Sequence, residues 1–170
     1  MSGLEGTGQL LRLAWRRDRV LVPTSVVGLI ALSVGSARAT LALYPTDAEA
    51  TAGLAGILAN PAVIAMYGPL ASQTADALAV FKTVMMGAFL VSVLGLVVVR
   101  RHTRTEEDAG RLELVGAAAV GRRAPLAAAV ALATLAVLAA SALSGAGLAA
   151  VGLDPAGSVA FGVAWATAGL

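Results

Sequence analysis

The sequence predicts an all-α protein, a polytopic bundle of about four transmembrane helices. Three observations support this fold class. Hydrophobic residues make up 58% of the chain, charged residues only 13%, and most of the charges lie in short segments between long apolar runs. Soluble globular domains carry about 25% charged residues. A bilayer core of about 30 Å requires about 20 apolar helical residues per crossing, because backbone polar groups find no partner in lipid.

Four apolar segments meet or approach this requirement. We expect spans over residues 20–43, 75–99 and 124–151. The third of these is rich in alanine, which lets helix backbones approach closely, so it should pack against protein rather than lipid. A fourth segment, residues 156–170, is still apolar at Leu170 and is only about 22 Å long as a helix. The simplest interpretation is that residues 1–170 are the N-terminal part of a longer membrane protein.

The placement of arginine and lysine predicts the orientation in the cell membrane. Most basic residues precede the first span or lie between the second and third: Arg12, Arg16, Arg17, Arg19, Arg100, Arg101, Arg104, Arg111, Arg122 and Arg123. The loop of residues 44–74 has none. We therefore expect the N-terminus and the 100–123 loop in the cytoplasm and residues 44–74 outside. A cleaved signal peptide ending near Arg38 is an alternative, although the apolar run is long for one.

Several features outside the apolar runs carry their own predictions. Residues 4–19 resemble an amphipathic helix at the inner membrane surface, or else a basic flank that only orients the first span. In the outer loop, Thr46 and Glu49 have the spacing of a capping box at the start of a short helix. Arg38 and Lys82 lie near the outer ends of their spans. They either extend their charges to the outer interface or guide an anionic substrate inside the bundle.

No catalytic, cofactor or metal site is predicted. The chain has no cysteine and no Gly-rich phosphate loop ending in Lys-Ser or Lys-Thr, which excludes thiol chemistry and ATP binding by that loop. The single histidine, His102, lies between arginines and is expected to be a surface residue rather than a ligand or a base. The arginines of residues 100–123 alternate with acids and lack aromatic neighbours, which argues against nucleic-acid binding.

The cytoplasmic loop of residues 100–123 predicts a short charged helix. Thr105 can cap it, and the acidic residues that follow favour its first turn through the helix dipole. Glu107 and Arg111 are spaced as an i, i+4 pair, and Leu112 and Val115 share an apolar stripe. An amphipathic helix held between two spans is suited to docking a partner. A solvated connector is the alternative.

Residues 101–115, followed by Gly121-Arg122-Arg123, resemble the cytoplasmic coupling segment of type-2 ABC exporter permeases. The shared pattern is an arginine, paired acids, a glycine, a Leu-Glu-Leu triplet and then a basic residue before the third span. Residues 10–19 are similar to the amphipathic entry helix of that family. Residues 43–46 and 59–62 resemble the actinobacterial branch that exports polyketide antibiotics.

This resemblance implies a permease without ATPase activity or cofactor, which moves a hydrophobic, antibiotic- or polyketide-like molecule out of the cell. An ABC-type ATP-binding subunit would dock on residues 105–115, through Glu106, Glu107, Arg111, Leu112, Glu113 and Leu114. Members of this branch are much longer, so the remaining spans of the permease or a second copy would complete the bundle. The alternative is a small membrane-embedded assembly or regulatory protein without transport activity.

Overall fold

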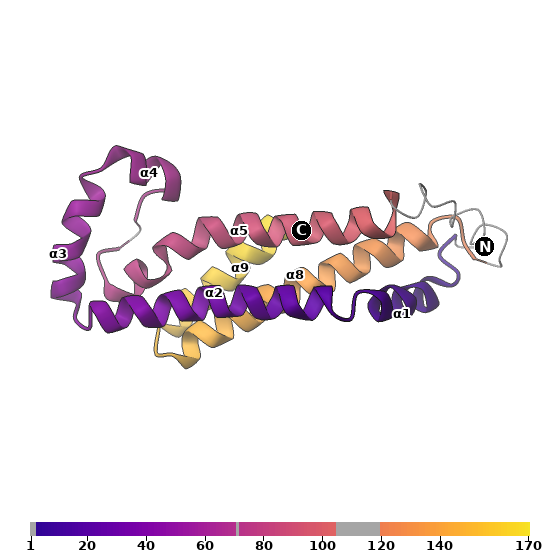
Figure 1. Cartoon of the computed structure of the whole chain (residues 1–170), viewed down its shortest axis with the longest axis horizontal. Helices are drawn as coiled ribbons and strands as arrows, with labels where there is room; N and C mark the ends of the chain where they lie inside the picture. Colours follow the sequence, from indigo (N-terminus) through magenta and orange to yellow (C-terminus); the bar gives the residue numbers. More distant parts are fainter. Residues whose placement is uncertain (1–2, 71, 105–119) are drawn as a thin grey trace.

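The described part of the chain is built from helices. The computed structural model describes residues 3–70, 72–104 and 120–170, and these ranges contain no strand. The helices are α1 (Thr7–Arg17), α2 (Leu21–Leu43), α3 (Asp47–Leu58), α4 (Pro61–Tyr67), α5 (Ala75–His102), α8 (Ala124–Ala150) and α9 (Pro155–Gly169). Figure 1 shows α2, α5 and α8 along the long axis of the molecule, with α3 and α4 at one end and α1 at the other. The predicted all-α class is confirmed.

Three helices are long and apolar enough to cross a bilayer, namely α2, α5 and α8 with 23, 28 and 27 residues. They begin within a residue of the expected starts, and α5 continues past the expected end at Val99 to His102. Helix α9 has 15 residues and begins with Pro155, whose missing N–H costs nothing in the first turn. The described residues therefore contain three apolar helices of bilayer-crossing length, and α9 is too short to be counted with them.

Helices α5 and α8 form the centre of the bundle. Helix α2 packs against both of them, α9 packs against both as well, and α1 packs against α8. The buried share of the apolar stretch rises from 22% in α2 to 33% in α5 and 44% in α8. The alanine-rich helix is thus the most enclosed of the three, as its small side chains predict.

Trp165 joins α9 to α5. Its indole is fully buried and lies over Gly87 of α5, where a Cβ atom would come within 1.8 Å of the ring. The indole Nε1 donates a hydrogen bond to the Val84 carbonyl oxygen at 3.2 Å, and the Phe161 ring lies 4.6 Å from the indole between centroids. A buried tryptophan needs a partner for its N–H, and the backbone of α5 supplies it.

Helices α8 and α9 form a tight hairpin. The turn passes through Gly152 at φ +100°, and the Asp154 carboxylate then caps α9 by accepting a hydrogen bond from Gly157 N at 2.7 Å. Along the crossing, a Cβ on Gly145 would come within 2.8 Å of the Ser158 carbonyl oxygen, and one on Gly162 within 3.0 Å of the Ser141 carbonyl oxygen. Glycine at these two positions therefore allows the backbones to approach.

The 44–74 loop folds into two short helices at one end of the bundle. The capping box predicted for Thr46 and Glu49 is present: Glu49 N donates to Thr46 Oγ1 at 3.3 Å, and Thr46 N donates to Glu49 Oε2 at 3.2 Å. Asn60 then caps α4, accepting a hydrogen bond from Ala62 N at 3.0 Å. Taken as a single apolar stretch, α3 and α4 bend by 111°. Buried Leu54 packs with Leu78 of α5 and holds this loop against the bundle.

Candidate functional site

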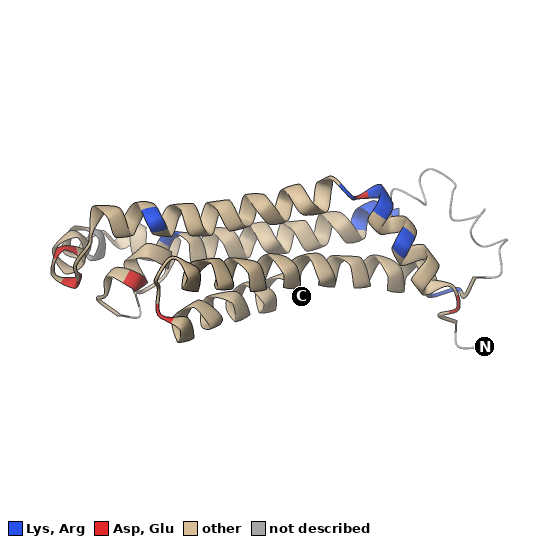
Figure 2. Ribbon diagram, turned by 90° about the horizontal axis from the view of Figure 1, so that it is seen from below, with Lys and Arg blue, Asp and Glu red and all other residues tan. Residues whose placement is uncertain are grey.

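The two ends of the bundle differ in charge. Figure 2 shows most Lys and Arg residues at the end where α1 lies and most Asp and Glu residues toward the opposite end. The basic end contains the last turn of α5, with Arg100 and Arg101, and the start of α8 after Arg123. This asymmetry is the one from which the sequence predicts a cytoplasmic face.

A buried carboxylate lies at the basic end. Asp18, between α1 and α2, is fully buried. Its Oδ2 atom lies 2.7 Å from His102 Nε2, within hydrogen-bonding distance. Its Oδ1 atom lies 2.8 Å from Arg101 Nε and forms an ion pair there, although the geometry is not that of a hydrogen bond. Burying a carboxylate is costly unless charged or hydrogen-bonding partners surround it, and α5 supplies both here. This cluster of Asp18, Arg101 and His102 fixes the α1–α2 junction to the end of α5.

His102 therefore corrects a prediction. The expected surface histidine is wrong, because its side chain is only 8% exposed and contacts a buried acid. The sequence contains one signal for this contact. Asp18 is the single acid within residues 12–19, a strongly basic segment just before the first span. That position is where a charge must be paired before the chain enters an apolar environment.

The N-terminal segment also holds the start of α8. Gly121 N donates to the Glu5 carbonyl oxygen and Arg123 N donates to the Gly3 carbonyl oxygen, both at 2.9 Å. A Cβ on Gly121 would come within 2.3 Å of the Gly3 carbonyl group, so this approach requires glycine. The N-terminal region thus contacts α5 before residue 105 and the chain again after residue 119. We call this arrangement the N-terminal clamp, formed by residues 3–18 on residues 101–102 and 120–123.

The predicted partner-binding residues lie outside the described residues. These are Glu106, Glu107, Arg111, Leu112, Glu113 and Leu114. What the structure does describe is the clamp on either side of them. Their role as a docking element therefore stays a prediction.

Arg38 and Lys82 are both exposed on the surface of this chain. Neither forms an ion pair with the described residues, and neither lines the grooves described here. Exposure agrees with charges that extend toward an interface. Guidance of an anionic substrate stays a prediction for the complete assembly.

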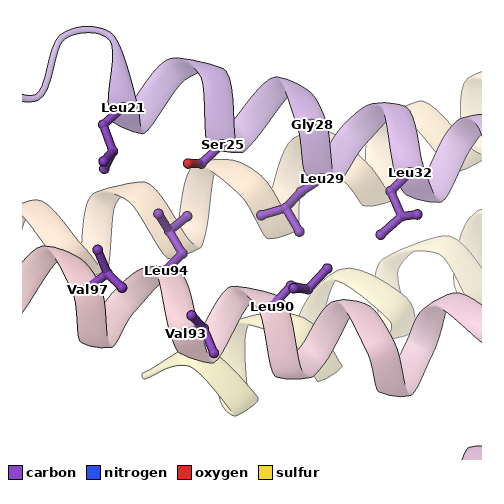
Figure 3. A pocket seen from close by; sticks show the side chains of 9 residues that line it. All are labelled: Leu21, Ser25, Gly28, Leu29, Leu32, Leu90, Val93, Leu94 and Val97. Carbon is purple, nitrogen blue, oxygen red and sulfur yellow. The ribbon is translucent and has the colours of Figure 1, made fainter.

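Helices α2 and α5 enclose a shallow apolar groove of about 330 Å³. Figure 3 shows Leu21 and Leu29 of α2 facing Leu94 and Val97 of α5 across it. Ser25 is the one residue with a polar side chain in its wall, and Gly28 leaves open space beside it. The groove suits an apolar chain or ring system. Among the described residues, no group of three or more His, Asp or Glu side chains could hold a metal ion.

Helix α1 is amphipathic, but some of the apolar residues predicted to share one side of it lie on different sides. Ala14 is buried and Leu11 packs against the core, whereas Leu13 and Trp15 are exposed. The apolar side predicted for this helix is therefore divided between protein contact and the outer surface. Trp15 is exposed, and a position of this helix at the membrane surface stays a prediction.

No family model matches this chain. It is similar to the multidrug efflux system permease protein Rv1217c of Mycobacterium tuberculosis, with 42% identity over 173 aligned residues. The match covers 99% of this chain and 31% of that relative, so the chain spans about a third of the length of the protein it matches.

Proposed function

We propose that this chain forms a membrane-spanning part of an efflux permease. The observation that carries the proposal is the 42% identity to a multidrug efflux permease along 99% of the chain. Three helices of bilayer-crossing length and one-sided basic charge support it. The chain contributes transmembrane helices to a transport pathway and leaves energy supply to a partner.

That partner is proposed to be an ABC-type ATP-binding subunit. The type-2 exporter pattern of residues 101–115 motivates this choice, and the chain has no phosphate loop of its own. The subunit docks on residues 105–115 at the cytoplasmic face. The N-terminal clamp supports this role, because it ties the ends of the docking segment to α1, α5 and α8. Movement of the docked subunit is then transmitted to α1, α5 and α8 together.

The cargo is proposed to be a hydrophobic small molecule of the antibiotic or polyketide kind. The apolar groove between α2 and α5 is lined by leucine and valine with a single serine, which suits such a molecule better than a charged one. Arg38 and Lys82 lie on exposed surfaces and are proposed to guide acidic cargo where the complete assembly encloses them.

The test compares Leu112→Asp with the matched polar change Glu107→Gln in the permease as expressed from its gene. Burying a leucine contributes about 1.5–3 kcal/mol, whereas an exposed ion pair contributes about 0–1 kcal/mol. We expect Leu112→Asp to weaken co-purification of the ATP-binding subunit and to lower export of a hydrophobic dye such as Nile red, both more strongly than Glu107→Gln does. Glu107→Gln should keep most of the co-purification of the ATP-binding subunit and most of the dye export.

Three outcomes would contradict parts of this proposal. Full retention of the partner and of export with Leu112→Asp would make residues 105–115 a connector. If the intact protein binds the ATP-binding subunit but deletion of its gene leaves dye export unchanged, an assembly or regulatory role would be favoured. For the guidance role, Arg38→Gln and Lys82→Gln should reduce export of acidic cargo more than neutral cargo. Equal reductions would remove that role.

A further inference from the structure

The groove between α2 and α5 occupies only the half of the bundle nearest the basic end. On α2 its wall runs from Leu21 to Leu32, in the first half of that helix. On α5 it runs from Leu90 to Val97, in the half that leads to the basic end. At 1.5 Å per residue the α2 wall is about 16 Å long, close to half of a ~30 Å bilayer core. The groove therefore has the length of one leaflet.

The groove becomes more polar toward the basic end. Ser25, the one residue with a polar side chain in its wall, lies one turn from Leu21. Arginines follow beyond the wall. Arg100 comes seven residues after Val93, which is close to two helical turns, so it lies on the same face of α5. Arg19 comes two residues before α2 begins, and both arginines are exposed.

These two arginines differ from their neighbour Arg101. The Arg101 guanidinium pairs with the buried Asp18 carboxylate, whereas Arg19 and Arg100 form no ion pair with the described residues. Their charges are thus open to an anion from outside the chain. A leaflet-long apolar groove that ends at two cations is complementary to an apolar chain that ends in an anionic group.

A second apolar groove, between α8 and α9, lacks this complementarity. Its volume is about 440 Å³, and its wall includes Pro155, next to the acidic Asp154 at the turn between the two helices. Residues 124–170 contain no lysine or arginine. This groove is therefore an internal comparison, apolar like the first but without a cationic end.

We propose that the groove between α2 and α5 binds an anionic phospholipid from the leaflet that meets the basic end. One acyl chain lies in the groove, and the phosphate group contacts Arg19 and Arg100. A further membrane-spanning helix fits less well, because it would follow α2 along its whole length, whereas the groove ends at Leu32. A zwitterionic lipid offers the same acyl chain but no net negative charge for the arginines.

The experiment uses two photoreactive lipids and the purified permease in nanodiscs of phosphatidylcholine. Both lipids carry a diazirine in the same acyl chain. One has a phosphatidylglycerol headgroup and the other a phosphatidylcholine headgroup, and mass spectrometry of peptides locates the labelled residues. We expect phosphatidylglycerol to label α2 and α5 beside the groove more strongly than phosphatidylcholine. Beside the groove between α8 and α9, the two lipids should label equally.

Substitution of the two arginines tests the headgroup contact. Each basic residue near a membrane surface contributes about five-fold in affinity for an anionic lipid. Arg19→Gln with Arg100→Gln should therefore lower the preference for phosphatidylglycerol about 10- to 25-fold and leave phosphatidylcholine labelling unchanged. Arg19→Lys with Arg100→Lys keeps both charges and should keep the preference. Arg38→Gln with Lys82→Gln, the matched loss of two exposed charges near the other ends of α2 and α5, should keep it as well.

Two glycines of α2 test the position of the acyl chain. Gly28 and Gly35 are both exposed, and a Cβ atom on either would meet nothing within 4 Å. Only Gly28 belongs to the groove wall. Gly28→Leu should therefore fill the groove and remove labelling of α2 and α5 by both lipids, whereas Gly35→Leu should keep it. Labelling that survives Gly28→Leu would place the acyl chain elsewhere and overturn the site.

Two other results would also overturn the lipid site. The first is equal labelling by the two lipids beside α2 and α5, or a preference that survives the glutamine changes. The second is absence of labelling together with a disulfide between Ser25→Cys and a cysteine in another helix of the permease, which would mean that a helix covers the groove.

The lipid site does not rest on the proposed function, because a lipid binds whether or not the protein transports. Only competition between the acyl chain and an apolar cargo in the same groove rests on it. Arginine-dependent labelling of a permease that exports no dye would leave the lipid site standing while the proposed function falls. Dye export without any preference for phosphatidylglycerol would do the reverse.

Discussion

The two ends of the bundle hold their acidic residues in different ways. At the basic end, Asp18 is buried and contacts side chains of another helix, Arg101 and His102. At the opposite end, acids contact backbone N–H groups. Asp47 accepts from Ala75 N at 2.9 Å and Asp76 accepts from Asp154 N at 2.8 Å. At the basic end, helices are held together by contacts between charged side chains. At the opposite end, they are held together by acidic side chains near helix starts that accept hydrogen bonds from backbone N–H groups.

The difference separates two uses of charge. An acid at a helix start is favoured by the helix dipole and by free N–H groups, and its loss leaves donors that water can satisfy. An acid buried against an arginine and a histidine leaves unpaired groups behind when it is removed. We therefore expect a single substitution of an acid to lower the free energy of unfolding more at the basic end than at the opposite end.

The largest effect concerns the side of the membrane on which each end lies. Residues 1–170 contain no cysteine, so Ala52→Cys and Arg122→Cys each introduce a thiol at an exposed position, and the protein without either change is the control for background labelling. An impermeant maleimide applied to intact cells should label position 52 and leave position 122 unlabelled until the cells are opened. Labelling of position 122 from outside would reverse the predicted orientation.

The next effect is Asp18→Asn, which leaves Arg101 and His102 without their carboxylate. We expect the free energy of unfolding to fall by about 2–3 kcal/mol, in line with hydrogen bonds to charged groups. The measurement is thermal or urea unfolding of the purified protein in detergent. Asp76→Asn, the matched change at the opposite end, should cost about 1 kcal/mol or less. Similar losses for the two variants would remove the distinction between the ends.

A smaller effect than that of Asp18→Asn is expected for Asp154→Ala, which removes the side-chain cap of α9. A lost cap costs about 1 kcal/mol. The same unfolding assay should rank it below Asp18→Asn, and Asp154→Asn should recover most of the loss, because asparagine caps as well as aspartate. If the asparagine variant is as unstable as the alanine variant, charge rather than capping would be responsible.

The helices could be predicted from sequence because each follows from local signals. Apolar runs of sufficient length predict α2, α5 and α8, and the capping box of Thr46 and Glu49 predicts where α3 begins. These signals lie within a few residues of the elements they specify. Hydropathy does not say which helices become neighbours, and nothing in the sequence predicted that α2 and α9 would lie apart, each against α5 and α8.

The candidate sites were predicted less well for the same reason. Asp18 and His102 are separated by 84 positions, so their contact follows from packing and not from spacing. The close approach of α8 and α9 at Gly145 and Gly162 likewise follows from packing. The pattern of residues 105–115, by contrast, was visible in the sequence, and its role stays a prediction because it lies outside the described residues.

The two tryptophans of the chain give it an internal pair of optical reporters. Trp15 is half exposed on α1, and Trp165 is sealed between α9 and α5 with its N–H bonded to a carbonyl group. Water-soluble quenchers will therefore reach one indole and not the other, and the enclosed one will emit at shorter wavelength. A single fluorescence spectrum can thus follow the N-terminal clamp and the seating of α9 separately, without any attached label.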